Sequence, residues 1–176
     1  MTGAKPFSRA AEVATRLRPM LAADLEAVMA LEHELFPEDA WRPEMFAEEV
    51  AQPPELRLYL VAEAGPGAAR QLRLAGYAGM MFVPGAPGKG GTADVLTIAV
   101  AQAAWGQGIG SALLEALTGE ARRRRCDEVF LEVRKDNPRA RGLYLRRGFT
   151  EIGVRRGYYQ PANVDAIVMR KDLAAS

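Results

Sequence analysis

The sequence predicts an α/β fold in which helices cover both faces of a mixed central sheet. Two observations lead to this prediction. Apolar periodicity gives the element order β-α-α-β-β-β-α-β-α-β-β, in which two helices cross between strands in the second half of the chain. Residues 95–117 also read as a strand, a glycine turn and a helix. The 176 residues suit one domain with a sizeable core.

The first half of the chain is punctuated by proline. Pro37 ends an apolar helical stripe, and Pro43 is well placed as the first residue of a second helix, since proline fits a first turn but cannot continue a helix. Residues 1–15 lack a clear period and are predicted to be a flexible tail, followed by a single domain at 16–172. The elements predicted in this half are a strand at 16–20, helices at 24–36 and from 43 to before 53, and strands at 56–64 and 72–83.

In the second half, helix ends carry recognisable caps. Asn137 and Pro138 have the residue types of an N-cap and a first helical position, and Gly148 suits the C-terminal cap. The apolar stripe of the preceding helix consists of Ile109, Leu113, Leu114 and Leu117. The remaining strands are predicted at 95–100, 128–134, 149–156 and 165–171.

Gly106, Gly108 and Gly110 indicate a binding site for an anion. Glycine lets a ligand approach the backbone closely, and the first N–H groups of a helix lack partners within it. The spacing fits a dinucleotide fingerprint poorly, and no P-loop is present. On this stretch alone, an ordinary crossover between strands stays open as the alternative.

Composition excludes several classes of protein. A net charge of +1 gives no global sign of a nucleic-acid or membrane partner. One cysteine and one histidine make a disulfide impossible within the chain and a metal site unexpected. No apolar run approaches the roughly 18 residues of a membrane span, so a cytoplasmic enzyme is the default expectation.

Two separated motifs resemble one family. Trp105 to Gly110 is similar to the acetyl-CoA signature [QR]-x-x-G-x-[GA], with Trp105 where Gln or Arg is usual and Gln102 where Pro often precedes it. Residues 131–149 resemble the second half of the same core: Leu-Glu-Val-Arg, then Asn137, and then Gly148-Phe149. The chain thus resembles the GNAT N-acetyltransferases over 16–172. Within this family it most closely resembles the type that acetylates ribosomal-protein alanine. That narrower resemblance rests on Phe36-Pro37 with Trp41 and Phe46, on residues 131–134, and on residues 155–159 followed by 165–167.

The resemblance implies a GNAT fold, in which the parallel strands at 95–100 and 128–134 splay to admit the pantetheine of acetyl-CoA. Acetyl-CoA is the implied co-substrate, and no metal is expected. Asn137 would contact CoA, which its N-cap role does not prevent. The implied cofactor-binding residues are Ile98, Ala99, Val100, Gly106, Gln107, Gly108, Ile109, Gly110, Ser111 and Asn137.

Glu132 and Tyr144 are the candidate catalytic residues. Acetyl transfer needs a neutral amine, and a partly desolvated Glu132 has the chemistry of a general base; pairing with an arginine such as Arg134 is the structural alternative. The resemblance assigns Tyr144 the general-acid role toward the CoA thiolate, against the alternative of a core tyrosine. An N–H at the strand end 98–100 has the chemistry of an oxyanion donor.

The leading hypothesis is acetylation of a protein N-terminus, which the resemblance narrows to the N-terminal alanine of small-subunit ribosomal protein number eighteen. The alternatives are a GNAT enzyme acting on a small amine, such as a polyamine or an aminoglycoside, and a non-catalytic acyl-CoA-binding domain. Seven acidic residues between Glu32 and Glu49 are opposed only by Arg42. They suggest an acidic groove for a basic peptide, or an ordinary solvated helix face.

Overall fold

Within the described residues, a seven-stranded mixed sheet in the order β1-β2-β3-β4-β5-β7-β6 forms the centre of the molecule. This computed structural model describes residues 16–38, 40–63 and 74–173. The strands are β1 (Leu17–Pro19), β2 (Arg57–Glu63), β3 (Leu74–Val83), β4 (Gly91–Val100), β5 (Cys126–Arg134), β6 (Thr150–Tyr159) and β7 (Val164–Asp172). The helices are α1 (Leu25–Leu35), α2 (Pro43–Val50), α3 (Ile109–Arg123) and α4 (Pro138–Arg146), with short 3₁₀ turns at Ala22–Asp24 and Gln102–Ala104.

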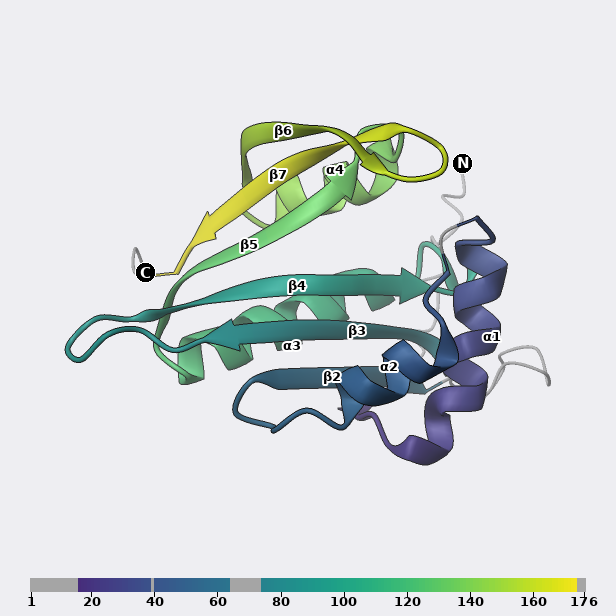
Figure 1. Ribbon diagram of the computed structural model, residues 1–176, viewed down its shortest axis with the longest axis horizontal. Coiled ribbons are helices and arrows are strands. Elements are labelled where there is room, and N and C mark those ends of the chain that lie inside the picture. Colours follow the sequence, from purple (N-terminus) through teal and green to yellow (C-terminus); the bar gives the residue numbers. More distant parts are fainter. Residues whose placement is uncertain (1–15, 39, 64–73, 174–176) are drawn as a thin grey trace, which may run out of the picture.

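Helices lie on both faces of this sheet, as the sequence predicts. Figure 1 shows α1 and α2 in front of the β2–β4 part and α3 behind it, with α4 behind β5 and β7. The predicted stripe of α3, from Ile109 to Leu117, is buried against the sheet. On β5, Val129, Leu131 and Val133 are buried while the alternate side chains are only partly covered. The α/β prediction is therefore confirmed.

The helix ends follow the predicted chemistry. Asn137 Oδ1 accepts a hydrogen bond from the N–H of Ala140 at 3.0 Å, which makes Asn137 the N-cap of α4. Gly148 has a φ of 83° just after that helix, in the left-handed region that glycine tolerates. Pro43 begins α2, also as predicted.

The strand bounds differ from the prediction at the paired end of the sheet. β4 begins at Gly91, four residues before the expected start, and β5 begins at Cys126. Residues 91–94 carry no apolar pattern, yet their ladder with β3, including Val83 opposite Thr92, keeps them extended. The predicted tail, residues 1–15, and residues 72 and 73 lie outside the described residues. Within the described residues, no helix is long and apolar enough to cross a membrane.

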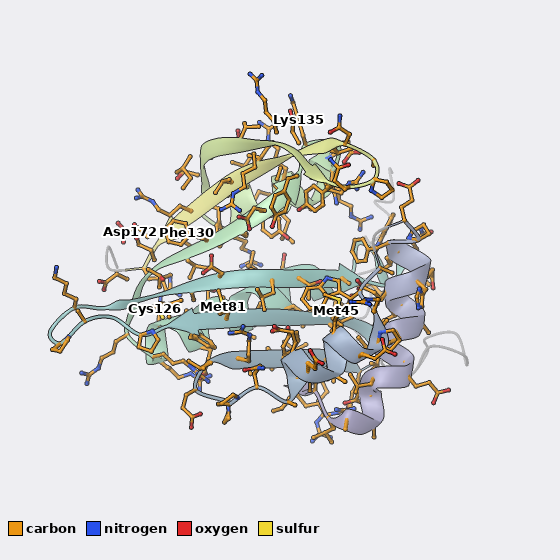
Figure 2. All side chains as sticks on the ribbon, in the orientation of Figure 1. Met45, Met81, Cys126, Phe130, Lys135 and Asp172 are labelled. Carbon is orange, nitrogen blue, oxygen red and sulfur yellow. The ribbon has the colours of Figure 1, made fainter. Side chains whose placement is uncertain are left out.

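β4 and β5 form a fork. Their parallel ladder runs from Gly91 opposite Cys126 to Val95 opposite Leu131 and goes no further, whereas β5 stays paired with β7 as far as Arg134. The two strands diverge toward their carboxyl ends (Figure 1). In Figure 2, Cys126 marks the paired end and Lys135, the residue after β5, marks the open end. The implied splay of two neighbouring parallel strands is thus present.

Candidate active site

Two cavities meet at the open end of the fork. The first, here the glycine-side cavity, has a volume of about 650 Å³ and extends from the turn before α3 to α4. The second, the acceptor-side cavity, has a volume of about 430 Å³ and lies between α1, β5 and the loop after β6. Both are lined by Phe36, Ile98, Asn137, Ala140 and Tyr144. A ligand that passes between β4 and β5 can therefore reach both.

The glycine-side cavity gathers nine of the ten residues expected to bind the cofactor. The exception is Gln107, whose side-chain amide donates to the carbonyl oxygen of Ala103 at 3.3 Å and which does not line the cavity. The nine are Ile98, Ala99, Val100, Gly106, Gly108, Ile109, Gly110, Ser111 and Asn137. Their roles in cofactor binding stay predictions.

The turn before α3 requires glycine for its backbone conformation. Gly106 and Gly108 have φ values of 80° and 79°, in the left-handed region that other residues avoid. A Cβ at either position would meet no atom within 4 Å, so glycine is required by the backbone conformation and not by lack of space. Gly108 is the N-cap of α3, and the first turn of that helix lines the cavity at Gly110 and Ser111. This end of the helix favours an anion.

The open end of β4 presents backbone groups to the gap. The N–H of Ala101 donates to the carbonyl of Ala75 on β3 at 2.9 Å. Because amide direction alternates along a strand, the amides of Ile98 and Val100 point away from β3 and toward the side that β5 has left. These groups are suited to hydrogen bonding with a ligand that lies in the fork.

Glu132 lines the acceptor-side cavity and pairs with an arginine other than the one considered from sequence. Its carboxylate lies 3.3 Å from a guanidinium nitrogen of Arg155 on β6, and its side chain is 24% exposed. Arg134 forms two hydrogen bonds of 3.0 Å to Asp136. Burial, and then the charge of Glu132, raise the pKa of nearby Asp94 on β4, while Arg155 opposes the shift. Asp94, Glu132 and Arg155 thus form one electrostatic cluster.

Tyr144 lines both cavities and is buried. Its ring packs edge-on against Phe149, with centroids 5.9 Å apart. Burial raises the pKa of Tyr144 to about 12, so the phenol keeps its proton at physiological pH. A neutral phenol beside the gap can donate a proton or a hydrogen bond into it.

The wall of the acceptor-side cavity includes Glu32, which the sequence placed in the acidic segment at 32–49 without assigning it a contact. Glu32 of α1 is buried and accepts hydrogen bonds from the hydroxyl of Tyr77 and, at 3.1 Å, from the N–H of Trp41. It tethers the loop between α1 and α2 to β3. The sequence signal for this role was the position of Glu32 on the apolar stripe of the helix predicted at 24–36, because a buried carboxylate needs hydrogen-bond partners.

A second group that was not among the predicted site residues comes from the end of β6, although the family resemblance included it. Tyr158 and Tyr159 line the acceptor-side cavity, and their rings pack edge-on at 5.1 Å. The hydroxyl of Tyr159 donates to the carbonyl of Glu132 at 3.4 Å, and the guanidinium of Arg134 lies 5.3 Å from its ring centroid. The sequence showed the Tyr-Tyr pair but gave no contact for it. Among the described residues, no group of three potential metal ligands occurs.

The fork between β4 and β5 and the glycine turn at the N-terminus of α3 are the features that the resemblance to acyl-CoA-dependent acyltransferases implies. The acetyltransferase (GNAT) family model matches residues 25–149, and the chain belongs to this family.

The relatives in sequence carry the same kind of activity in their names. The N-alpha-acetyltransferase RimI of Mycobacterium tuberculosis (strain ATCC 25618 / H37Rv) is 38% identical over 151 residues, which are 85% of this chain and 87% of that protein. The putative [ribosomal protein bS18]-alanine N-acetyltransferase of Bacillus subtilis (strain 168) is 27% identical over 153 residues, covering 87% and 92% of the two chains. The resemblance to this type is confirmed.

Solved structures agree with the fold. The ribosomal-protein-S18-alanine N-acetyltransferase of Escherichia coli superposes with a TM-score of 0.72 at 27% identity, covering 92% of this chain and 96% of that one. Arabidopsis thaliana NAA60, crystallised with acetyl-CoA, reaches a TM-score of 0.76 at 20% identity, covering 92% of this chain and 100% of that one, a likeness in fold alone. The predicted GNAT fold is therefore confirmed.

Proposed function

We propose that this protein transfers the acetyl group of acetyl-CoA to the N-terminal α-amino group of a protein, with the alanine of ribosomal protein bS18 as the acceptor. The observation that carries the proposal is the junction of the two cavities. Tyr144 lines both, and Glu132 lines the one on the acceptor side. The residues present fit the proposed co-substrate, because the glycine turn offers an anion site and the open end of β4 offers backbone amides.

Glu132 has the role of general base in this proposal. An α-amino group has a pKa of about 8 and is mostly protonated at neutral pH, so a proton must leave before nitrogen can attack a carbonyl carbon. The carboxylate of Glu132 accepts that proton, directly or through a water molecule. Arg155 on β6 lies 3.3 Å from that carboxylate and pairs with it.

Tyr144 has the role of general acid. When bound, acetyl-CoA supplies a thioester, whose acyl carbon gains the C–N bond and loses the C–S bond. The phenol of Tyr144 is protonated at physiological pH and donates a proton toward the departing sulfur. The backbone N–H groups of Ile98 and Val100 face the same gap and are suited to polarise the acyl oxygen.

The protein acceptor is supported by the relatives named for S18-alanine acetylation, by the M. tuberculosis relative named as an N-alpha-acetyltransferase, and by the cavity wall. Phe36, Trp41, Tyr158 and Tyr159 surround the acceptor side with aromatic surface suited to an extended peptide. Of the acidic residues between 32 and 49, Glu32 lines this cavity, and Glu49 pairs with Arg57. A ribosomal acceptor would place the reaction in the cytoplasm.

Acetylation of a matched acceptor panel tests the proposal. Peptides with the N-terminal residues of bS18 are compared with the same peptides blocked at the α-amine, and with spermidine and an aminoglycoside, by mass spectrometry. We expect acetylation of the free α-amine, fastest for peptides that begin with alanine and carry downstream arginines. Faster acetylation of the small amines would contradict the acceptor, and CoA binding without turnover on any amine would contradict the enzyme.

A further inference from the structure

The turn before α3 carries an aromatic residue in an unusual place. Trp105 occupies the position where the acetyl-CoA signature usually has Gln or Arg. Its indole Nε1–H donates to the carbonyl oxygen of Val100 at 2.8 Å, so the ring is fixed against the end of β4. The side chain remains 45% exposed and lines the glycine-side cavity. The chain therefore has a rigid ring where a polar side chain is usual.

A guanidinium lies on that ring. The central carbon of Arg139 is 3.9 Å from the Trp105 ring centroid, within the range of a cation–π contact. Arg139 belongs to the first turn of α4, so the stacked pair bridges the cavity from the glycine turn to α4. Stacking uses the face of a guanidinium and leaves its N–H edge available for hydrogen bonds.

The charge of this cavity is positive. Arg146 lies seven residues after Arg139, about two helical turns on, and lines the same cavity. Among the described residues, neither arginine forms an ion pair, and no carboxylate lines the cavity. Two uncompensated guanidiniums thus share a cavity with the N-terminus of α3, an arrangement that favours a phosphate group.

We propose that Arg139, held in position by Trp105 and assisted by Arg146, forms a clamp on α4 that binds a phosphate group of CoA opposite the glycine turn. In this chain the cation comes from α4, since the turn itself carries the tryptophan. The inference rests on the proposed co-substrate. The phosphate chemistry is shared by the diphosphate and the 3′-phosphate of CoA, which dephospho-CoA distinguishes because it lacks the latter.

Calorimetric titration of the Arg139→Met variant with CoA and with dephospho-CoA is the primary test. Methionine keeps a long apolar side chain on Trp105 and removes the charge. We expect affinity for CoA to fall about tenfold or more, as loss of a charge-assisted hydrogen bond implies, and the loss to shrink at high salt. An equal loss with dephospho-CoA assigns the clamp to the diphosphate; a loss only with CoA assigns it to the 3′-phosphate.

Arg141→Met is the matched control. Arg141 lies on the same helix but pairs with Glu151 and does not line the cavity, so its substitution is expected to leave both affinities unchanged. Wild-type affinity in Arg139→Met, or an equal loss in Arg141→Met, would overturn the clamp. Gly108→Val, which disturbs the left-handed turn, is expected to weaken CoA binding whether or not the clamp exists. Absence of CoA binding by the wild-type protein would overturn the proposed function itself.

A double-mutant cycle tests the positioning role of Trp105. Trp105→Gln introduces a residue that the signature usually carries and removes the stack. We expect this variant to lose less affinity than Arg139→Met, and the double variant to bind CoA no more weakly than Arg139→Met alone, because Trp105 acts through Arg139. Additive losses would show that Trp105 contacts CoA independently and would overturn its positioning role.

Discussion

Glu128 and Glu132 lie on the same face of β5, and each forms an ion pair with an arginine. Glu128 lies 3.0 Å from Arg170, and Glu132 lies 3.3 Å from Arg155. The difference is in the neighbouring strand. Glu128 is opposite Thr92 within the parallel ladder, whereas β4 has separated before Glu132. Only Glu132 of this pair lines the acceptor-side cavity.

Position along β5, and not residue type, distinguishes the two glutamates. The same acid with the same kind of partner is a surface ion pair at one end of the strand and borders a junction of two cavities at the other. The candidate chemistry therefore depends on the divergence of β4 and β5 more than on the presence of a glutamate. Substitutions at the two ends of the fork are expected to have different consequences.

The largest expected difference is between Glu132→Gln and Glu128→Gln. Loss of a general base typically costs about 10²–10⁴-fold in rate, so kcat/KM of Glu132→Gln is expected to fall by that order at neutral pH. Part of the rate should return at high pH, where the amine loses its proton unaided. Glu128→Gln is expected to keep the wild-type rate. Steady-state kinetics from pH 6 to 10 measure both, and an unchanged profile in Glu132→Gln would make that glutamate structural.

A second contrast, between Leu131→Ala and Ile98→Ala, concerns the free energy of unfolding. Leu131, the last residue of the parallel ladder, is 1% exposed, and truncation of such a leucine typically costs about 2–5 kcal/mol. Ile98 lies at the open end and is only partly buried, so Ile98→Ala is expected to lower the free energy of unfolding by less. Urea denaturation measures both. The activity of Ile98→Ala with acetyl-CoA should nevertheless fall. Equal losses in the free energy of unfolding for the two variants would contradict the difference between the paired and open parts of the fork.

Sequence reasoning recovered the elements well because their signals are local. The stripe of α3 and the alternation of β5 each follow from one continuous segment, and the cap at Asn137 needs only its own helix. The start of β4 was missed, because residues 91–94 are held by their ladder with β3 and have no apolar pattern. The divergence of β4 and β5 came from the family resemblance, since nothing in either segment alone encodes it.

Contacts across the site were the least predictable part. The arginine that pairs with Glu132 comes from β6, two strands away in the sheet, although Arg134 is nearer in sequence. Asp94 was not considered, because its relation to Glu132 arises only when β4 lies beside β5. Trp105 was noted as a departure from the signature, but its stack with Arg139 requires α4 to fold back over the turn.

Tyr144→Phe tests the general-acid role at the junction of the two cavities, and its expected loss of rate is smaller than that of Glu132→Gln. A thiol has a pKa near 8.5, so its thiolate leaves fairly readily, and we expect a loss toward the lower end of the usual range, about 10²-fold or less. CoA affinity should be preserved. Because the pKa of Tyr144 is about 12, the wild-type rate should not fall from loss of this proton below about pH 11. Tyr59→Phe, on β2 outside both cavities, is the control, and equal rates in the two variants would remove the acid role.

The smallest expected effect concerns Asp94, on the β4 side of the fork. Burial, and then the charge of Glu132, raise the pKa of this carboxyl above its unfolded value. Its contribution to stability is therefore fully present below the unfolded pKa and is lost as the pH rises through the folded pKa, because the folded state must then hold a partly desolvated charge. Asp94→Asn removes that loss, and the gain at pH 7.5 should be below about 1 kcal/mol because the group is only half-buried and solvent screens it.

Thermal unfolding at pH 7.5 and pH 4 measures this effect, with Asp136→Asn as a control of opposite sign. A hydrogen bond from Arg134 lowers the pKa of Asp136, so that carboxylate contributes stability above its unfolded pKa and loses it as the pH falls. Asp94→Asn should therefore gain stability relative to wild type between pH 4 and pH 7.5, whereas Asp136→Asn should lose it. No gain in Asp94→Asn would contradict the raised pKa of Asp94, and a gain in Asp136→Asn would contradict the lowered pKa of Asp136.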